Sequence, residues 1–469
     1  MADFRMEKDS MGEMKLPTDS LYGATTQRAV ENFPVSGLRF SRDFIRTLAA
    51  IKSACAEVNQ KLGKLDPKIA AAITSASAEV AEGKYDAHFP IDIFQTGSGT
   101  STNMNFNEVA ANVANLALGS GVGTKKPVHP NDHVNMGQSS NDIIPTAIHV
   151  AAAVMVQEQL LPALKNLRAT LQKKSGAFDK IVKTGRTHLQ DATPILLGQE
   201  FSGYENQVKK GIERVERALT GLCELPVGGT AVGTGINTDA QFGKHVSEVL
   251  AKKLRLPFRE AENHFEAQAS KDACVEMSGA LKTVAVSLTK IANDIRWLAS
   301  GPRCGFAEII LPAVQPGSSI MPGKVNPVIP ESLLQVCAQV MGNDLAITLG
   351  GQSGSFELNV MMPMMAHNLL QSIQILANGV KMFDTKCAAG IEANTARILE
   401  TVERSLMLAT PLAPVVGYDK AAEISKKAFA QNKTVREVAL ETLDLSKEQL
   451  NEILDPSKMV IPGAGGGGE

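Results

Sequence analysis

The sequence is poor in aromatic residues, in cysteine and in net charge, and each shortage excludes a class of protein. Aromatic residues make up 4% of the 469 residues, six residues are cysteine, and the formal net charge is −2. A charge this close to zero provides no basic surface of the kind that binds nucleic acid. The cysteines form no C-x-x-C pair, so their spacing predicts no metal cluster, and we expect buried thiols in a reducing compartment.

Long hydrophobic runs are missing too. The longest, VAAAVMV at 150–156, is far shorter than the roughly 20 apolar residues that span a bilayer. The first ten residues, MADFRMEKDS, mix charges and contain no apolar core of a secretory signal. We therefore expect a soluble protein that binds neither membrane nor nucleic acid. Its expected location is the cytoplasm, with a processed mitochondrial form as the alternative.

The residues that are abundant favour helices. The apolar content is mostly Ala, Leu, Val and Ile, which suits helix-on-helix packing. Within 263–300, apolar residues recur at alternating steps of three and four: Cys274, Met277, Leu281, Val284, Leu288, Ile291, Ile295 and Leu298. This seam predicts one long helix. Further long helices are predicted at 141–173, 198–220, 330–349 and 357–392, with Pro162 expected to kink the first.

These stretches predict a mainly α-helical protein built around a bundle of five long helices. We expect three domains: a mixed N-terminal domain with turns and short helices (1–138), a central helical bundle (139–394), and small helices with a disordered Gly-rich tail (395–469). The apolar run Val284, Ala285, Val286 and Leu288 covers several faces of its helix. A helix apolar over so much of its girth is buried all round, which favours a homo-oligomer.

The segment GSSIMPGKVNP, 317–327, combines hydroxyls, a lysine, Gly and Pro between two helical runs. It is no nucleotide-phosphate loop, because five residues separate Gly317 from the Gly-Lys pair and Val325 follows Lys324. A flexible helix connection is one interpretation. The other is a mobile lid, because Asn326 is expected to cap the next helix and its free N–H groups, with Lys324, would attract an anion.

Three further polar stretches contain candidate binding residues. In QTGSGTSTNMNFNE, 95–108, the hydroxyls around Gly99 suit either a carboxylate or a capped turn. In KKPVHPNDHVNMGQSSND, 125–142, Pro130 disfavours a His-x-x-x-His metal site, so His129, Asn131 and Asp132 are expected to form a polar surface loop. The Ser139–Asn141 segment of the same stretch should cap the next helix, where an anion could bind.

In GRTHLQDATP, 185–194, His188 is either structural or an acid–base group oriented by a carboxylate, for which Glu331 is the candidate. The inventory is thus a set of carboxylate binders, a histidine, a lysine and a serine-bearing loop. It fits proton abstraction beside a carboxylate, without metal or cofactor.

Taken together, these stretches resemble the fumarase/aspartase superfamily. GSSIMPGKVNP resembles its signature loop, and YGATTQRAVENFPVSG, GSGTSTNMN, HPNDHVN, QSSND, GRTHLQDA, GGTAVGTG and ANDIRWL match its other blocks in order. The sequence is most similar to the class II fumarases, because Ser98 stands where aspartases usually have alanine and because of GSFELNV at 354–360. The resemblance implies interconversion of fumarate and L-malate, with aspartate ammonia-lyase as the alternative and a non-catalytic descendant of a lyase as a third possibility.

The resemblance also implies an assembly and a set of roles. Four chains would pack their bundles into a twenty-helix core, with each active site shared by three chains. Ser318 would be the base, Lys324 and Asn326 would hold the charge of an aci-carboxylate, and His188 with Glu331 would handle water. The implied carboxylate-binding residues are Ser98, Thr100, Ser139, Ser140, Asn141, Thr187 and Ser319, together with Lys324 and Asn326. A second dicarboxylate site would comprise Lys126, His129, Asn131 and Asp132, with Lys126 where relatives often have Arg.

Overall fold

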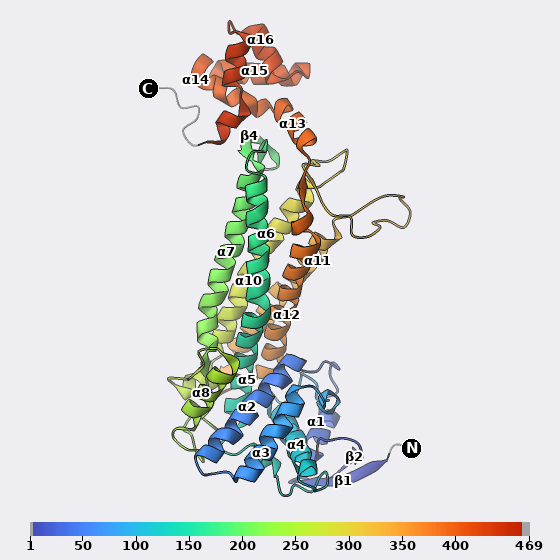
Figure 1. Cartoon of the computed structure of the whole chain (residues 1–469), viewed down its shortest axis with the longest axis vertical. Helices are drawn as coiled ribbons and strands as arrows, with labels where there is room; N and C mark the ends of the chain where they lie inside the picture. The colour runs from blue at the N-terminus through green and yellow to red at the C-terminus, as the bar shows by residue number, and fades with distance from the viewer. Residues whose placement is uncertain (1–2, 462–469) are drawn as a thin grey trace. The chain divides into compact units, whose positions relative to one another are not determined.

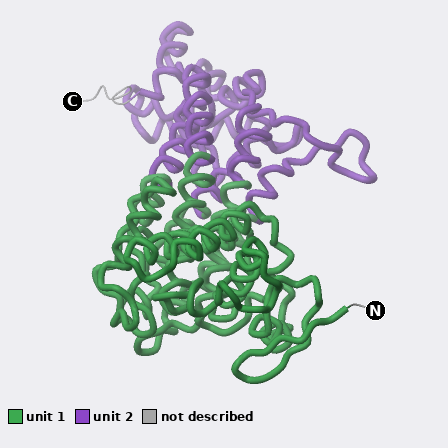
Figure 2. Tube along the Cα trace, turned by 60° about the horizontal axis from the view of Figure 1, so that its bottom comes forward, with its two compact units in different colours: residues 1–162, 212–285, 336–378 green, residues 163–211, 286–335, 379–469 purple. Residues whose placement is uncertain are grey.

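The computed structural model describes residues 3–461 (Figure 1). They divide into two compact units that alternate along the sequence (Figure 2). Unit 1 comprises 1–162, 212–285 and 336–378, and unit 2 comprises 163–211, 286–335 and 379–469, of which 1–2 and 462–469 are not described. The three sequential domains stay a prediction. The Gly-rich tail predicted to be disordered lies outside the described residues.

Unit 1 is mostly helical and holds only short strands. Its hairpin β1–β2 is antiparallel, with Phe4 opposite Pro17 and Asp9 opposite Gly12. Its complete elements are β1 (Phe4–Asp9), β2 (Gly12–Pro17), α1 (Ala24–Asn32), α2 (Arg42–Lys61), α3 (Pro67–Ala81), η1 (Asp86–His88), α4 (Thr100–Ala117), η2 (Pro130–Val134), α5 (Ser140–Met155), η3 (Val156–Leu160), β5 (Glu224–Leu225), α8 (Phe242–Leu254), β6 (Arg259–Glu260), α9 (His264–Ala269), β8 (Gly354–Ser355) and β9 (Leu358–Asn359).

Unit 2 contains one hairpin of functional interest, β3–β4, and a run of short C-terminal helices. The small helices predicted within 395–469 are confirmed, with α15 and α17 among them. Its elements are β3 (Val182–Thr187), β4 (Gln190–Leu196), β7 (Ile309–Ile310), η4 (Ala388–Gly390), β10 (Glu392–Ala393), α13 (Thr395–Arg404), η5 (Leu406–Leu412), α14 (Ala413–Val416), α15 (Tyr418–Gln431), α16 (Val435–Thr442), α17 (Lys447–Ile453) and η6 (Pro456–Val460).

Long helices contribute residues to both units. They are α6 (Leu161–Ala177), α7 (Leu197–Leu222), α10 (Asp272–Leu298), α11 (Val328–Gly351) and α12 (Met362–Lys386). The predictions for α7 and α11 were accurate to within two residues at each end. The helix predicted over 357–392 was too long, because its ends join β9 and β10 instead. Strand β10 pairs with the distant β7, and local periodicity does not reveal such pairing.

The predicted seam of α10 is confirmed as core. Its eight apolar residues, from Cys274 to Leu298, are each at most 4% exposed. The single helix predicted over 263–300 is wrong, since α9 ends at Ala269 and α10 starts at Asp272. The buried Lys271 ammonium donates hydrogen bonds to backbone carbonyls at the end of α9. Val286 is 54% exposed in the single chain, so part of the apolar surface of α10 is not covered by the rest of the chain.

The stretch 140–177 is long and apolar enough to cross a membrane by length and composition, but 78% of its most apolar window is buried inside the protein. Such burial is typical of a core helix. The expected disturbance by Pro162 takes the form of the π-helical segment η3 directly before it. A proline lacks the N–H that would continue the α-helical ladder, which explains the local change in hydrogen bonding.

The sequence led us to expect only short helices in the N-terminal region, but two of its helices are long. Helix α2 has 20 residues and α4 has 18. The α4 sequence is rich in Asn, which favours turns in isolation. Here the Asn105 and Asn112 amides donate to the carbonyls of His88 and Leu21, so tertiary hydrogen bonds override the local preference.

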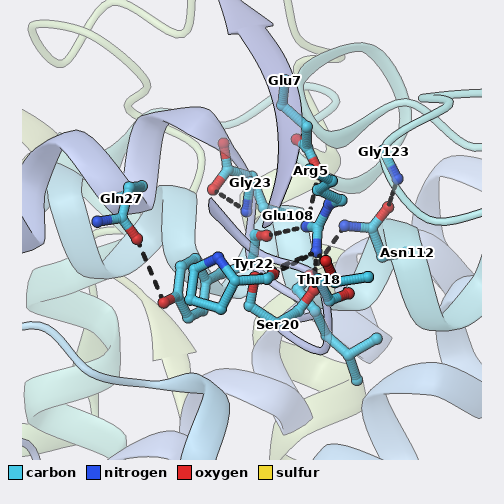
Figure 3. Close-up of polar contacts among 12 residues, drawn as sticks. Arg5, Glu7, Thr18, Ser20, Tyr22, Gly23, Gln27, Glu108, Asn112 and Gly123 are labelled. Atoms are coloured by element: carbon cyan, nitrogen blue, oxygen red, sulfur yellow. Dashed lines mark hydrogen bonds and ion pairs between the residues drawn. The ribbon is translucent and has the colours of Figure 1, made fainter. Parts of the chain in front are cut away.

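A polar cluster ties the N-terminal hairpin to α4 (Figure 3). Glu108 of α4 accepts the backbone N–H groups of Gly23, at 2.9 Å, and Thr26, at 3.1 Å, and so caps α1, whose own N-cap has no side chain. The Arg5 guanidinium is paired with Glu7 and donates to the carbonyls of Ser20 and others in the following loop. The hairpin and α1 are thereby anchored on the helix whose N-terminus begins the site described below.

The prediction that the cysteines are buried holds for five of them. Cys55, Cys223, Cys274, Cys337 and Cys387 are buried, whereas Cys304 is exposed. Cys304 follows the cis peptide bond between Gly301 and Pro302, in a loop whose residues have no helical or strand pattern to place them.

Candidate active site

The first group of predicted carboxylate-binding residues lies in unit 1, at the N-terminal ends of α4 and α5. The Ser98 hydroxyl is 2.7 Å from that of Thr100, which is 2.6 Å from that of Ser140. The three hydroxyls form a continuous chain between the two helix starts. Free N–H groups and the positive ends of helix dipoles favour an anion at such a place. The structure thus brings these three predicted residues together.

Two glycines allow the loop before α4 to take this path. Gly99 is the N-cap of α4 with φ +72°, a conformation that a side chain disfavours. A Cβ on Gly97 would lie 1.8 Å from the carbonyl oxygen of Val360. The Gly97 carbonyl also accepts the N–H of Met362 at the start of α12. The GSFELNV segment therefore lies directly against the loop that carries Ser98.

Ser139 caps α5, as predicted, in a reciprocal capping box with Asp142. The Ser139 hydroxyl accepts the N–H of Asn141 at 3.2 Å, and the Asp142 carboxylate accepts the N–H of Ser139 at 2.9 Å. The other Asp142 oxygen accepts the N–H groups of Gly228 and Thr230, at 3.1 and 3.0 Å. Burial raises the pKa of Asp142. Our sequence reasoning missed this residue, although the spacing Ser-x-x-Asp before an apolar run signals a capping box.

The GGTAVGTG segment, 228–235, supports the same helix start from the other side. The Asn141 side-chain amide donates to the Ala231 carbonyl at 2.8 Å, which fixes the direction of the amide. Together with the Asp142 bonds, this contact fastens the segment to the first turn of α5. A motif with no acidic, basic or thiol side chain thereby acquires a structural role beside the predicted carboxylate-binding residues.

Pro130–Val134 form one turn of π-helix, η2, where we expected a polar surface loop over 129–132. His129 is its N-cap, and the His129 Nδ1 accepts the N–H groups of Asn131 and Asp132, both at 3.2 Å. Pro130 occupies the first position, where no N–H is needed, so the proline starts the turn instead of preventing it. The exposed Asn131 and Asp132 and the half-buried His129 lie on this turn.

His133 shares that turn, since its Nδ1 accepts the N–H of His129 at 2.9 Å. Burial lowers the pKa of His133, so the ring is held neutral as an acceptor. Lys126 is exposed and precedes the turn. The four residues predicted for a second dicarboxylate site therefore lie within seven positions of one another, on or just before η2.

In unit 2, Thr187 and His188 lie at the exposed tip of the hairpin β3–β4. His188 and Leu189 form its two-residue turn, and both have φ +59°. Turns of this kind usually carry Asn-Gly, because both central residues need positive φ. A leucine in this conformation is a strained choice, and such strain concentrates at functional sites. The turn presents the His188 side chain outward from the unit.

A buried charge cluster holds the hairpin in place. Glu308 is fully buried and pairs with Arg186 of β3 at 2.8 Å and with Lys183 of β3 at 3.1 Å. Lys183 is also 3.2 Å from Glu200 of α7. Buried charges are stable only when paired in this way, so the cluster rigidly supports the strand that ends at Thr187. The sequence contained no periodic signal for Glu308, which lies in an irregular segment.

The loop 317–327 is mostly exposed, and Ser319 and Lys324 with it. The Ser318 hydroxyl oxygen accepts the N–H groups of Ile320 and Met321, at 3.2 and 2.9 Å. Two backbone donors on one hydroxyl oxygen favour negative charge on that oxygen. The Lys324 ammonium donates to the Asn326 side-chain oxygen at 2.7 Å, within the same loop.

The predicted N-cap role of Asn326 is wrong. Its amide donates to the Gly317 carbonyl at 2.6 Å and so closes the base of the loop, while α11 begins two residues later, at Val328. The Gly317 N–H donates to the Lys324 carbonyl at 2.8 Å. A Cβ on Gly317 would lie 2.6 Å from that carbonyl oxygen, so this close approach requires glycine.

A cleft of about 840 Å³ opens beside the base of this loop, within unit 2. Lys324, Asn326 and Glu331 line one side of it, and Arg296 and Trp297 of α10 line another. Arg296 and Trp297 were not singled out from the sequence, where they appeared only within the matching block ANDIRWL. No hydrogen bond joins His188 to Glu331 within residues 3–461, so the predicted pair is not formed within the single chain.

Among the described residues, no group of three or more His, Cys, Asp and Glu side chains could hold a metal ion. Besides scattered His, Asp and Glu side chains, the polar groups of the candidate site are hydroxyls, amides, ammonium groups and backbone N–H groups. They are donors suited to carboxylates rather than ligands suited to a transition metal.

Comparisons with known proteins agree with the geometry. A family profile described as lyase matches residues 12–342, and one described as the fumarase C C-terminus matches residues 408–460. The chain is 53% identical over 459 residues to the fumarate hydratase class II of Nitrosomonas europaea, covering 98% of this chain and 99% of that protein. It is 53% identical over 461 residues to the mitochondrial fumarate hydratase of Rattus norvegicus, covering 98% and 91%.

A solved structure shows the same fold. The class II fumarase of Schistosoma mansoni matches with a TM-score of 0.95 and 41% identity, over 98% of this chain and all of that one. The mainly helical fold and the lyase profile thus define a lyase of the fumarase/aspartase superfamily. Within it, the chain belongs to the class II fumarase family.

Proposed function

We propose that this protein catalyses the reversible hydration of fumarate to L-malate. The observation that carries the proposal is the 53% identity, over almost the whole chain, to relatives named fumarate hydratase. The residues that the chemistry needs are all present, and the hydroxyl chain of unit 1 suits a dicarboxylate. Aspartate ammonia-lyase is not favoured, because the relatives reported above carry the name of a hydratase.

In the proposed mechanism, Ser318 is the base. Its oxygen, as an alkoxide, takes the proton from C3 of malate, and the electrons of the C–H bond move into the adjacent carboxylate to form an aci-carboxylate. The N–H groups of Ile320 and Met321 support the charge on the alkoxide. Lys324 and Asn326 would hold the charge that develops on the substrate, where a donor contributes most.

His188, oriented by Glu331, completes the elimination. The protonated imidazole donates its proton to the C2 hydroxyl, the C–O bond breaks, and the aci-carboxylate collapses to fumarate with release of water. In the hydration direction the neutral imidazole takes a proton from water as the oxygen attacks. The outward-facing hairpin tip supports this role, because it leaves His188 available to substrate.

The carboxylates of the substrate would be bound by the residues at the two helix starts and on the two exposed segments: Ser98, Thr100, Ser139, Ser140, Asn141, Thr187 and Ser319. The turn with Lys126, His129, Asn131 and Asp132 would bind a second dicarboxylate. A single exposed lysine there lacks the bidentate geometry of an arginine, so binding at this turn should be weak. The reaction needs no metal or cofactor.

We infer that the protein works as a homotetramer with three sequential domains and a twenty-helix core, in which three chains share each active site. The exposed apolar surface of α10, such as Val286, supports association. The missing contact between His188 and Glu331 within one chain supports sharing, since a neighbouring chain can supply the partner. We place the protein in the cytoplasm.

The first experiment follows the ultraviolet absorbance of fumarate with purified protein, with and without ammonium and with a chelator. Loss of absorbance without ammonium, unchanged by chelator, supports a metal-independent hydratase. Loss that requires ammonium identifies an ammonia-lyase instead. No loss under either condition contradicts both activities.

A complementation experiment tests the shared site. Ser318→Ala and His188→Asn variants, each inactive alone, are unfolded, mixed in equal amounts and refolded together. If one chain supplies the serine and another the histidine, about a quarter of the sites should recover both residues. No recovery in mixed tetramers of confirmed composition would show that one chain supplies both.

A further inference from the structure

Lys52 of α2 is fully buried, with a side chain that is 0% exposed. Its Nζ donates to the side-chain oxygens of Asn135, at 2.9 Å, and Gln138, at 2.8 Å. No ion pair is formed by Lys52 within the part of the chain that the structure describes. A buried ammonium is costly, so its retention without a carboxylate partner requires strong compensation from these amide oxygens.

The Asn135 side-chain oxygen is a hub for two helices. Besides Lys52 of α2, it accepts the side-chain amides of Asn103 and Asn107 of α4, both at 3.1 Å. One oxygen therefore joins α2, α4 and the segment 135–138. Asn59, two turns after Lys52 on α2, adds a bond to the Met136 carbonyl at 3.0 Å.

The residues bonded to Asn135 and Lys52 lie next to both helix starts that carry the proposed carboxylate-binding hydroxyls, those of α4 and α5. Gln138 immediately precedes the cap of α5, and Asn103 is in the first turn of α4. The Thr100 and Ser140 hydroxyls that meet at 2.6 Å belong to those two helix starts. The hydrogen bonds of Lys52 and Asn135 therefore help to set the distance between the two helix starts.

The charges that face Lys52 are few. Asp142, also fully buried and at the N-terminus of α5, and Cys55, one turn along α2, are the titratable groups that act on it. Burial raises the pKa of the Cys55 thiol to about 12, so the thiol is neutral near pH 7. Burial lowers the pKa of Lys52 itself to about 7. Whether charged or neutral, the amine retains enough N–H groups to donate to both amide oxygens.

We propose that Lys52 is a positioning residue for substrate binding: its buried amine holds the segment 135–138 and the start of α4, and so fixes the hydroxyls that bind a carboxylate of the substrate. The inference rests on the proposed hydratase activity. Because these hydroxyls would contact the carboxylate before and during the reaction, loosening them should weaken binding of substrate and transition state alike. Such a loss raises KM and leaves kcat nearly unchanged.

The test compares Lys52→Met with a matched control, Lys271→Met. Lys271 is also a buried lysine of unit 1, but its ammonium binds only backbone carbonyls at the end of α9. We expect Lys52→Met to raise the KM for fumarate roughly tenfold or more, as for loss of a charged hydrogen bond, with kcat within about threefold. Lys271→Met should lower stability and leave KM within about twofold.

A double variant, Lys52→Met with Gln138→Leu, separates positioning from stability. It removes the unpaired Gln138 oxygen but also the hydrogen bonds that the Gln138 amide donates to the carbonyls of Val134 and Met136. The unfolding midpoint should therefore recover in part relative to Lys52→Met, while KM stays raised. It also serves as the test protein if Lys52→Met fails to fold. Recovery of a normal KM together with stability would overturn the proposal, because the lysine would then be structural only.

Two further outcomes also decide the question. Equal increases of KM in Lys52→Met and Lys271→Met would overturn it, as would an unchanged KM in a folded Lys52→Met protein. A wild-type protein without fumarate turnover contradicts the hydratase proposal itself and is recognised before any variant is made. Failure of the positioning role is therefore distinct from failure of the function.

Discussion

The proposed carboxylate-binding end in unit 1, with Ser98, Thr100 and Ser140, and the serine loop 317–327 in unit 2 are built in opposite ways. Ser98 and Ser140 are buried, and their loops are fastened by capping bonds, close glycine contacts and the Asn135 hub. Most of the loop that carries Ser318 is exposed, and its polar side chains bond mainly to the loop itself. The first region is fixed by its surroundings, and the second by its own backbone.

The difference has a physical basis. Carboxylates are bound by many weak donors, which contribute most when they are already in place, so their binding site benefits from rigid helix starts. The residue that removes a proton must approach the substrate after binding, which suits an exposed loop. The hairpin with His188 combines both designs, since a buried charge cluster supports an exposed and strained tip.

The largest effect is expected on the loop side. Ser318→Ala removes the proposed base and should lower kcat by about 10³ or more, because one catalytic group is lost outright. Fumarate binding, measured by calorimetry, should persist, since the donors of unit 1 are untouched. Near-normal turnover in this variant would remove Ser318 from the mechanism and with it the functional contrast between the regions.

The second largest effect is expected when the buried charge cluster that supports the β3–β4 hairpin is broken. Glu308→Gln leaves Lys183 and Arg186 without their buried carboxylate and should cost about 3–5 kcal/mol of unfolding free energy. The control is Glu441→Gln, which removes an exposed ion pair with Lys433 and should cost at most about 1 kcal/mol. Chemical unfolding of both variants measures the difference, and similar costs would show that the cluster is not essential to the hairpin.

In unit 1, Asp142→Asn places an amide group where both oxygens accept backbone N–H groups. At least one donor loses its acceptor, so the free energy of unfolding should fall by about 1–3 kcal/mol, with a raised KM. Asp66→Asn is the matched control, because Asp66 caps α3 at an exposed position and Asn caps equally well. Urea unfolding and steady-state kinetics distinguish the two, and equal behaviour would argue that burial of Asp142 is unimportant.

The pH dependence of stability should report on Lys52. Burial lowers its pKa from 10.5 to about 7, so between these values the unfolded chain binds a proton that the folded chain does not. The free energy of unfolding should therefore rise with pH across this window, by up to about 1.4 kcal/mol per unit. The dependence is read as wild type minus Lys52→Met, which cancels the similar contribution of Lys271. A flat difference would mean that Lys52 is more hydrated than the structure indicates.

The smallest effect is expected at the turn 129–132. Lys126→Ala should change kcat and KM for fumarate by less than about fivefold, because an exposed lysine contributes at most about 1 kcal/mol to an ionic contact. Lys126→Arg should strengthen any second dicarboxylate site by offering two parallel donors. Calorimetry with malate checks both variants. A large kinetic effect of Lys126→Ala would assign this turn to the main site.

The sequence by itself determined the helical class and singled out the candidate site residues. The seam from Cys274 to Leu298 is set by periodicity, which is a local property, and it proved to be core. The cap at Ser139 follows from residue types within one turn. The residues in the Ser98 and Ser318 loops could likewise be singled out because hydroxyls, glycines and a lysine cluster within short stretches.

Only the tertiary structure decided what joins distant residues. The hub on Asn135, the support of Glu308 for the hairpin and the burial of Lys52 link segments up to 125 positions apart, as between Lys183 and Glu308. It also overturned Asn326 as a helix cap, because the Lys324 ammonium donates to the side-chain oxygen that a cap would use, while the amide donates to the Gly317 carbonyl. The sequence of a segment shows which hydrogen-bond donors and acceptors it contains. Which of them pair with each other depends on which segments pack together in the fold.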